Sequence, residues 1–244
     1  GYMLLFAMIA DVLDGRVARM SQTTSSFGGQ LDSLCDMISF GVAPAFLVLK
    51  VLEHHLPEIA SSNVVISNFL ERFIWLVAAV YLSCAAIRLA RFNVENEEGE
   101  TAHMSFRGLP TPAGAGVLVS LVIFREVVLS DSIETSAFFR IIDYTVLYSL
   151  PFITIGVAFL MISRIRYPHI VNQYLKGKKP LTHLISLVGI IGLIWLCGFE
   201  NATLIAFCGF ALTGFSKWLY YRVLKNKKTH EHDQHPPLSI TNGP

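Results

Sequence analysis

Charged residues are scarce in this chain. Of its 244 residues, 15% are charged and 53% are hydrophobic, whereas about a quarter of the residues of a soluble globular domain are charged. The net charge is only +1, so there is no broad basic surface of the kind that binds nucleic acid. The composition therefore favours a polytopic membrane protein.

Cysteine is also scarce, and its spacing excludes two kinds of site. No Cys-x-x-Cys pair occurs, which argues against a zinc site and a disulfide framework. We expect the four cysteines to be reduced packing residues in apolar runs: Cys35, Cys84, Cys197 and Cys208.

Long apolar runs predict an all-α transmembrane helix bundle of about six to seven spans. Residues 53–63 are polar and contain Pro57, so we expect a loop there. Residues 1–224 are expected to form one transmembrane domain, and residues 225–244 a disordered cytoplasmic tail. The runs expected to cross after a partial first helix are 28–52, 64–92, 109–129, 138–165, 183–199 and 202–224.

The distribution of lysine and arginine predicts the orientation. If the spans alternate, most Lys and Arg residues fall on the side that holds residues 11–36, and few fall on the opposite side. By the positive-inside rule that side is cytoplasmic. We therefore expect a protein of the inner (cytoplasmic) membrane, in contact with membrane lipids, whose site faces the cytoplasm.

Four aspartates are the most informative polar residues. Asp11 and Asp14 are three residues apart, and Asp32 and Asp36 are four apart, so each pair lies on one face of a helix. Acids this close repel one another and are costly beside an apolar core unless a cation lies between them. Oxygen ligands with room for water and phosphate suit Mg²⁺ or Mn²⁺ rather than zinc.

Small and basic residues accompany the acids. Gly15, Ala18, Gly28 and Gly29 leave room for a ligand or a second helix to approach the backbone. The neighbouring Arg16 and Arg19 add positive charge suited to anions, so the stretch is typical of a diphosphate site.

The pattern D-x-x-D-G-x-x-A-R, eight residues, G-x-x-x-D-x-x-x-D resembles that of the CDP-alcohol phosphotransferases, membrane enzymes that transfer a phosphatidyl group from a CDP-activated lipid to an alcohol. Every fixed position is matched. The resemblance implies that two metal ions are held by Asp11, Asp14, Asp32 and Asp36, and that Asp36 is also the general base. It implies a CDP-lipid pocket containing Asp14, Gly15, Ala18, Arg19 and Gly28.

Further residues resemble the branch of the family that produces phosphatidylserine. The similarity includes Arg88-Leu-Ala-Arg91-Phe-Asn93 and Gly108-Leu-Pro-Thr-Pro112, and implies CDP-diacylglycerol and L-serine as substrates. A serine carboxylate needs a guanidinium, so Arg88 and Arg91 are candidates for the acceptor site or for the lipid phosphate. Their alternative role is that of interfacial anchors. Weaker acceptor candidates are Asn93, Ser39 and Arg107.

Other interpretations remain open. Glycerol 3-phosphate, inositol phosphate or choline can replace serine as the acceptor within the family. An intramembrane prenyltransferase also holds a diphosphate with acids and Mg²⁺, but its acidic motifs lie far apart in sequence. A transporter that uses buried carboxylates has no need of the Gly-x-x-Ala-Arg element.

The resemblance also carries two expectations about the whole chain. It implies a homodimer. It also implies a complete helix before the motif, whereas Gly1 to Ala10 would cover only about half of the roughly 30 Å hydrocarbon thickness. We therefore expect that an N-terminal helix is missing from this sequence.

Overall fold

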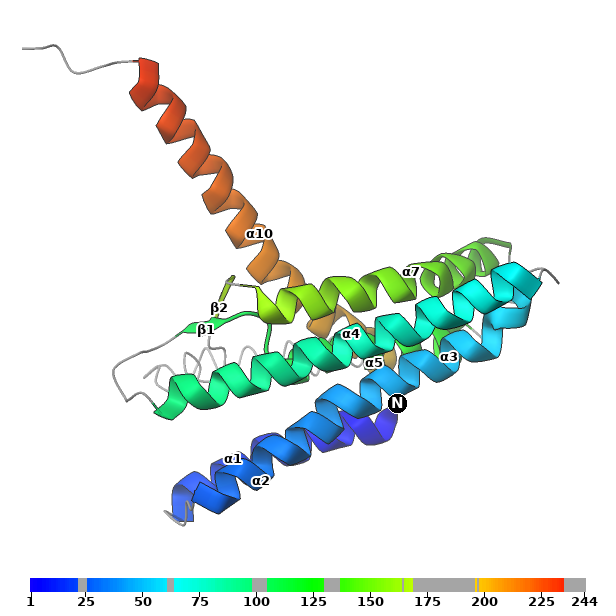
Figure 1. Cartoon of the computed structure of the whole chain (residues 1–244), viewed down its shortest axis with the longest axis horizontal. Coiled ribbons are helices and arrows are strands. Elements are labelled where there is room, and N and C mark those ends of the chain that lie inside the picture. Colours follow the sequence, from blue (N-terminus) through cyan, green and yellow to red (C-terminus); the bar gives the residue numbers. More distant parts are fainter. Residues whose placement is uncertain are drawn as a thin grey trace, which may run out of the picture.

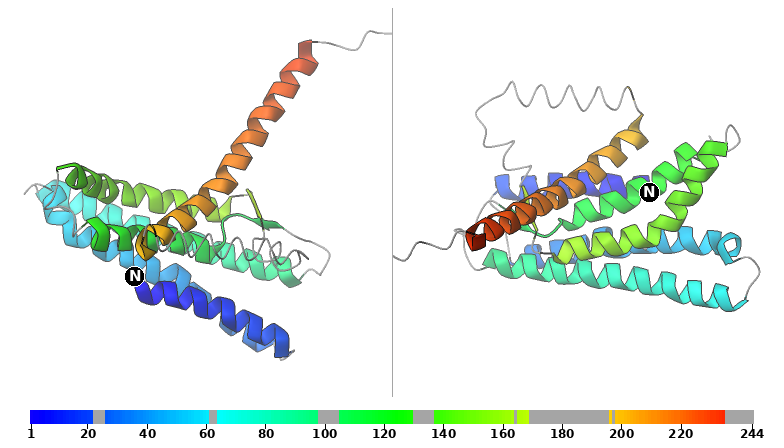
Figure 2. Two further views of the ribbon diagram at one scale, coloured as in Figure 1. Left: turned by 180° about the vertical axis from the view of Figure 1, so that it is seen from behind. Right: turned by 90° about the horizontal axis from the view of Figure 1, so that it is seen from above.

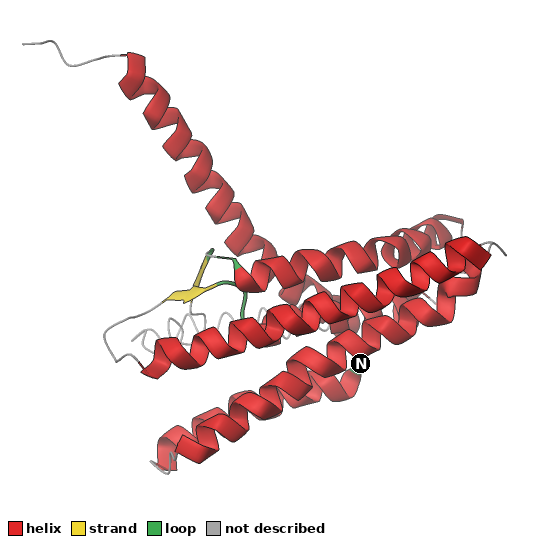
Figure 3. Cartoon of the chain, in the orientation of Figure 1, coloured by secondary structure: helices red, strands yellow, loops and turns green. Residues whose placement is uncertain are grey.

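The computed structural model describes residues 1–21, 26–60, 64–97, 105–129, 137–163, 165–168, 196 and 198–234. Within these ranges the fold is helical, apart from two three-residue strands (Figure 3). The chain order is α1 (Tyr2–Ser21), α2 (Ser26–Asp36), η1 (Met37–Val42), α3 (Ala43–Ala60), α4 (Val64–Glu97), β1 (Ser105–Arg107), α5 (Thr111–Ile123), η2 (Phe124–Leu129), α7 (Ala137–Ile162), β2 (Arg166–Pro168) and α10 (Phe199–Gln234).

Helices α2 and α3 are joined without a break by the π-helical turn η1, and proline chemistry explains the local change of winding. Pro44 has no amide proton, so it cannot donate to the carbonyl of Phe40 four residues earlier. Instead, the hydroxyl of Tyr81 donates to that carbonyl over 2.9 Å, and the amide of Ala43 donates to Ile38, five residues back. The sequence correctly predicted a continuous helix here, but not its π turn.

Helix α3 extends further than the sequence predicted. It continues to Ala60 with Pro57 inside it, so the prediction of a loop starting at residue 53 is wrong. Glu, His, Leu and Ala are compatible with a helix, and one proline removes a single hydrogen bond from the ladder. Polarity alone therefore did not end the helix.

Helix α5 lies at the centre of the molecule. Every residue from Gly114 to Ile123 is buried, and α5 packs against α1, α3, α7 and α10, while α4 packs along both α3 and α7 (Figures 1 and 2). A Cβ atom added at Gly116 would collide with the ring of Phe207 on α10. Small residues in α5 thus allow close helix packing.

The two strands form a short antiparallel pair in which Phe106 faces Tyr167 in register. Gly108 follows β1 with φ +86°, a conformation that favours glycine. Its amide donates to Ile165 over 2.8 Å, and a Cβ there would collide with the carbonyl of Met161. This turn fixes the start of α5 against the end of α7.

Helix α10 extends away from the other helices toward its C-terminus (Figure 1). It continues to Gln234, so the described part of the expected disordered tail is helical. No proline or glycine interrupts residues 225–234, and the first prolines follow at 236 and 237. Residues 235–244 lie outside the described ranges, and the division at residue 224 stays a prediction.

Four helical segments in the described ranges are long and apolar enough to cross a membrane: Phe27–Pro57, Val64–Val94, Thr111–Leu129 and Ala137–Ile162. The prediction of six to seven spans is not confirmed. The apolar helices Tyr2–Asp11 and Phe199–Gly214 are shorter than a span. Nearly all of the span expected at 183–199 lies outside the described residues.

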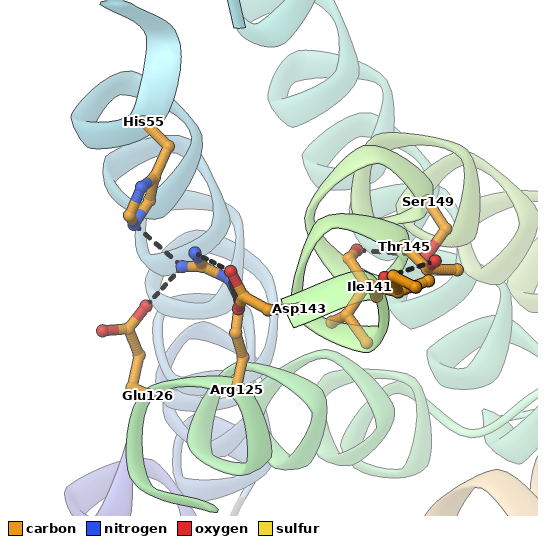
Figure 4. Close-up of polar contacts among 8 residues, drawn as sticks. His55, Arg125, Glu126, Ile141, Asp143, Thr145 and Ser149 are labelled. Atoms are coloured by element: carbon orange, nitrogen blue, oxygen red, sulfur yellow. Dashed lines mark hydrogen bonds and ion pairs between the residues drawn. The ribbon is translucent and has the colours of Figure 1, made fainter. Parts of the chain in front are cut away.

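Where α3 ends and α7 begins (Figure 1), a charge network centred on the buried Arg125 and Asp143 joins α3, η2 and α7 (Figure 4). Arg125 of η2 contacts Asp143 of α7 through Nη2 (3.1 Å) and through Nε (2.8 Å), the latter without the alignment of a hydrogen bond. Its Nη1 donates to Glu126 and to His55 Nε2, each over 2.8 Å. We call Arg125, Asp143, Glu126 and His55 the arginine network.

Three cysteines are described, and all three are free thiols. Cys84 is buried, Cys208 is half-buried and Cys35 is exposed. Free thiols agree with the expectation of reduced cysteines, but the exposure of Cys35 does not agree with a packing role. Cys197 lies outside the described residues.

Candidate active site

Helices α1 and α2, which carry the four acids, lie side by side at the end of the molecule where α4 also ends (Figure 1). The two helices follow one another, so the chain returns on itself between Asp14 and Asp32. Side chains of Asp11 and Asp36 are half-buried, and those of Asp14 and Asp32 are exposed. The helical spacing predicted from the sequence thus places four carboxyl groups on two neighbouring elements.

Electrostatic interactions show that the acids are close to one another. The carboxyl groups of Asp11 and Asp36 come within hydrogen-bonding reach of one another across the two helices. Burial raises the pKa of Asp11, and the negative charges of Asp32 and then Asp14 raise it further, while the hydrogen bond to Asp36 acts in the opposite direction. A hydrogen bond between two carboxyl groups requires a proton, which a bound cation can replace.

The donor set fits a hard divalent cation, because it consists of carboxylate oxygens only. The described side chains are not yet arranged as a closed set of ligands, since no three His, Cys, Asp or Glu among them are placed to hold an ion. Asp14 and Asp32 are exposed, so both can rotate toward the Asp11–Asp36 pair. An exposed side chain can change between staggered rotamers, so the four carboxyl groups are able to converge on a cation.

Other residues of the motif lie on the same two helices. The backbone of Gly15, Ala18 and Arg19 is part of α1, but their side-chain environments lie outside the described part of the chain. Gly28 is exposed in the first turns of α2. Their proposed contacts with a CDP-lipid stay predictions.

Helix α4 brings Arg88 close to the acids. The side chain of Arg88 is buried, with 8% of its surface exposed, and its charge acts on Asp36. Its guanidinium carbon lies 5.2 Å from the centre of the Phe92 ring, which is within cation–π range. A buried guanidinium beside a carboxylate cluster is suited to an anionic ligand that also contacts the cluster.

The remaining acceptor candidates differ in position. Arg91 is half-buried on α4, and Ser39 is half-buried in η1, three residues after Asp36. The side chain of Arg107 lies outside the described part of the chain. The side-chain amide of Asn93 contacts the hydroxyl of Ser33 on α2.

Sequence reasoning missed Ser33 and Tyr81. Ser33 lies between Asp32 and Asp36 and contacts α4, while Tyr81 is fully buried and binds the free carbonyl of Phe40. The proline four residues after Phe40 was a signal that this carbonyl would need a donor. Nothing in the sequence indicated which donor would supply it.

The described part of the chain thus combines membrane-length helices with a carboxylate cluster and a buried arginine at one end, an arrangement suited to a membrane-embedded protein that handles charged ligands. The chain belongs to the CDP-alcohol phosphatidyltransferase family, because the family model of that name matches residues 1–213. It is therefore an enzyme of phospholipid biosynthesis and an integral membrane protein. Enzymes of this family generally use divalent metal ions.

Three curated proteins from different organisms are similar to this chain over most of their own length. A Helicobacter pylori protein named CDP-diacylglycerol–serine O-phosphatidyltransferase is 31% identical over 223 residues, 91% of this chain and 80% of that protein. A Methanocaldococcus jannaschii protein of the same name is 34% identical over 188 residues, 77% of this chain and 73% of its own. The similarly named Bacillus subtilis protein is 30% identical over 163 residues, 66% of this chain and 70% of its own.

Proposed function

We propose that this protein transfers the phosphatidyl group of CDP-diacylglycerol to the hydroxyl of L-serine, giving phosphatidylserine and CMP. The observation that carries the proposal is the meeting of Asp11 of α1 with Asp36 of α2, with Asp14 and Asp32 close enough to act on Asp11 and with the buried Arg88 acting on Asp36. The names of the similar proteins support serine as the acceptor.

In the proposed reaction, the serine hydroxyl oxygen attacks the phosphorus that carries diacylglycerol. The bond from that phosphorus to the bridging diphosphate oxygen breaks, and CMP leaves with the electron pair. Asp36 accepts the hydroxyl proton, since a carboxylate next to the reacting oxygen can act as a general base. The protein contributes mainly positioning and neutralisation of charge.

The four aspartates would hold two ions of Mg²⁺ or Mn²⁺ in this scheme. Such ions supply positive charge to the diphosphate oxygens and stabilise the leaving group. Asp14, Gly15, Ala18, Arg19 and Gly28 would contact the CDP-lipid at the facing ends of α1 and α2.

Arg88 is the strongest candidate to bind the serine carboxylate. Its planar guanidinium can donate two parallel hydrogen bonds to a carboxylate, and it is buried close to the general base. Arg91 and Ser39 complete the proposed acceptor site. We do not include Asn93, because its amide is engaged by Ser33.

The excess of Lys and Arg around the motif supports a site that faces the cytoplasm at the inner membrane. Resemblance to the family supports a homodimer. The proposal therefore includes a site that faces the cytoplasm and a homodimeric assembly.

Purified protein in detergent or vesicles tests the function directly. It would be incubated with CDP-diacylglycerol and labelled serine, glycerol 3-phosphate, inositol phosphate or choline, with and without Mn²⁺, and the labelled lipid identified. We expect label from serine only, and no labelled lipid after chelation. Label from a different acceptor would refute serine as the substrate, and full activity after thorough chelation would refute the metal mechanism.

A further inference from the structure

The acid-bearing helix α2 is held to the rest of the bundle by few contacts at its N-terminal end. From Phe27 to Asp32 every residue is exposed, and Leu34 is 62% exposed. Toward the other end, Phe40 is buried and its carbonyl binds Tyr81 of α4. Between these regions, α4 contacts α2 through the side chains of Asn93 and Ser33.

The geometry of that contact assigns a direction to the hydrogen bonds. Ser33 Oγ lies 3.0 Å from the carbonyl oxygen of Gly29, 2.9 Å from Asn93 Nδ2 and 3.2 Å from Asn93 Oδ1. A hydroxyl has only one proton to donate. Donation to Gly29 leaves the hydroxyl free to accept from Asn93 Nδ2, and this arrangement uses the two shorter contacts.

The position of Ser33 in α2 links its own orientation to that of Asp32 and Asp36. It directly follows Asp32 and precedes Asp36 by three residues, so any rotation of α2 about its axis moves all three side chains together. The Tyr81–Phe40 bond holds the helix seven residues further along, and the Asn93–Ser33 bond holds it at the level of the acids. Together the two bonds fix both the position of α2 along α4 and its rotation.

We propose that Asn93 and Ser33 form a positioning pair that turns Asp32 and Asp36 toward Asp11 and so sets the affinity of the site for divalent cations. Asn93 then acts through α2 and does not bind the acceptor. This inference rests on the proposed metal site, and it differs from the role in acceptor binding that the sequence suggested for Asn93.

Measuring the affinity for Mn²⁺ and the KM for serine distinguishes a role of Asn93 in positioning α2 from a role in binding the acceptor. Binding of Mn²⁺ to the full chain would be followed by loss of the free-ion signal in electron paramagnetic resonance. Loss of a residue that orients metal ligands typically lowers metal affinity about 10- to 100-fold. We expect Ser33→Ala and Asn93→Ala each to weaken Mn²⁺ binding about tenfold, and the double variant to bind no more weakly than either alone, because the two residues form one interaction.

Two further variants serve as controls. Ser33→Thr keeps the hydroxyl and should keep the wild-type affinity. Ser83→Ala removes an exposed hydroxyl that bonds only within α4, to Ala79, and should also leave Mn²⁺ binding unchanged. At saturating Mn²⁺ the KM for serine should be the same in Ser33→Ala, Asn93→Ala and wild type.

An increased serine KM in Asn93→Ala alone, with normal Mn²⁺ binding, would overturn the positioning role and return Asn93 to the acceptor site. Additive losses in the double variant would also overturn it. Wild-type protein that binds no Mn²⁺ would refute the metal site itself, whereas wild-type-like binding by Ser33→Ala would refute only the positioning pair.

Discussion

At the scale of single residues, two neighbouring carboxyl groups have different environments and different proposed roles. Asp36 is half-buried between Asp11 and the charge of Arg88, whereas Asp14 is exposed on α1. A general base must be able to come within hydrogen-bonding reach of the reacting hydroxyl. Asp36 lies beside Arg88, the proposed acceptor-binding residue, so it is better placed for this role than Asp14.

The first prediction separates proton transfer from binding. Asp36→Asn keeps an oxygen ligand but cannot accept a proton, so it should abolish turnover and largely preserve binding of CDP-diacylglycerol. Asp14→Asn should weaken both. Release of CMP and equilibrium binding of the lipid would be measured for each variant. Wild-type rates of CMP release from Asp36→Asn would refute its role as the base.

The second prediction tests whether the planar guanidinium of Arg88 is needed, or only its positive charge. Arg88→Lys retains the positive charge but loses the planar pair of donors. Loss of one charged hydrogen bond, worth about 1.5 kcal/mol or more, should raise the KM for serine about tenfold. Arg72→Lys on the same helix is the control, since Arg72 is exposed near the opposite end of α4. An unchanged KM in Arg88→Lys would favour the role of interfacial anchor.

At the scale of helices, α4 holds the acid-bearing helix in place. Tyr81 is fully buried, and its hydroxyl satisfies the carbonyl that Pro44 leaves without a helical donor. The π turn therefore depends on a residue 41 positions away in the sequence. Such turns occur frequently at functional sites, and here the turn directly follows Asp36.

The third prediction tests this attachment. Tyr81→Phe removes the donor and leaves a buried carbonyl unpaired, which should destabilise the protein by about 1–3 kcal/mol. The midpoint of thermal unfolding in detergent should fall, and it can be compared with that of Ser83→Ala, which alters an exposed bond on the same helix. Equal midpoints for Tyr81→Phe and wild type would show that the Phe40 carbonyl does not depend on Tyr81.

Local patterns predicted some elements well and others poorly. The spacing of Asp11, Asp14, Asp32 and Asp36 correctly indicated two helices, because helical periodicity is a local property. The end of α3 was predicted wrongly, since a polar stretch with Pro57 is still able to form a helix. The Tyr81–Phe40 and Asn93–Ser33 contacts could not be predicted, because they depend on how α4 packs against α2 and η1.

At the scale of the whole molecule, polar contacts occur at both ends of an apolar bundle. The end where α4 finishes holds the proposed active site, and the end where α3 finishes and α7 begins (Figure 1) holds the arginine network (Figure 4). Arg125 and Asp143 expose only 7% and 10% of their side chains. Because arginine can only donate, His55 Nε2 must be the unprotonated nitrogen of its ring.

The fourth prediction is that this network holds α3, η2 and α7 together and that its parts are strongly coupled. Arg125→Met leaves the buried Asp143 without its partner, and breaking such a pair costs about 3–5 kcal/mol. Asp143→Leu should cost less, since Arg125 keeps Glu126 and His55. The double variant Arg125→Met/Asp143→Leu should unfold at a higher temperature than Arg125→Met alone.

Thermal unfolding in detergent would be compared with that of Glu53→Gln, which removes an exposed ion pair with Lys50 and should change stability little. Strictly additive effects of the two substitutions would contradict the coupling.

The central claim is that the four aspartates bind divalent cations as one site. The most direct measurement is the number of Mn²⁺ ions bound per chain in the presence of CDP-diacylglycerol, determined by electron paramagnetic resonance for wild type and for the variant with Asp11, Asp14, Asp32 and Asp36 all changed to Asn. We predict about two ions per wild-type chain and none in the variant at the same Mn²⁺ concentration. Equal binding by the two proteins would contradict the account.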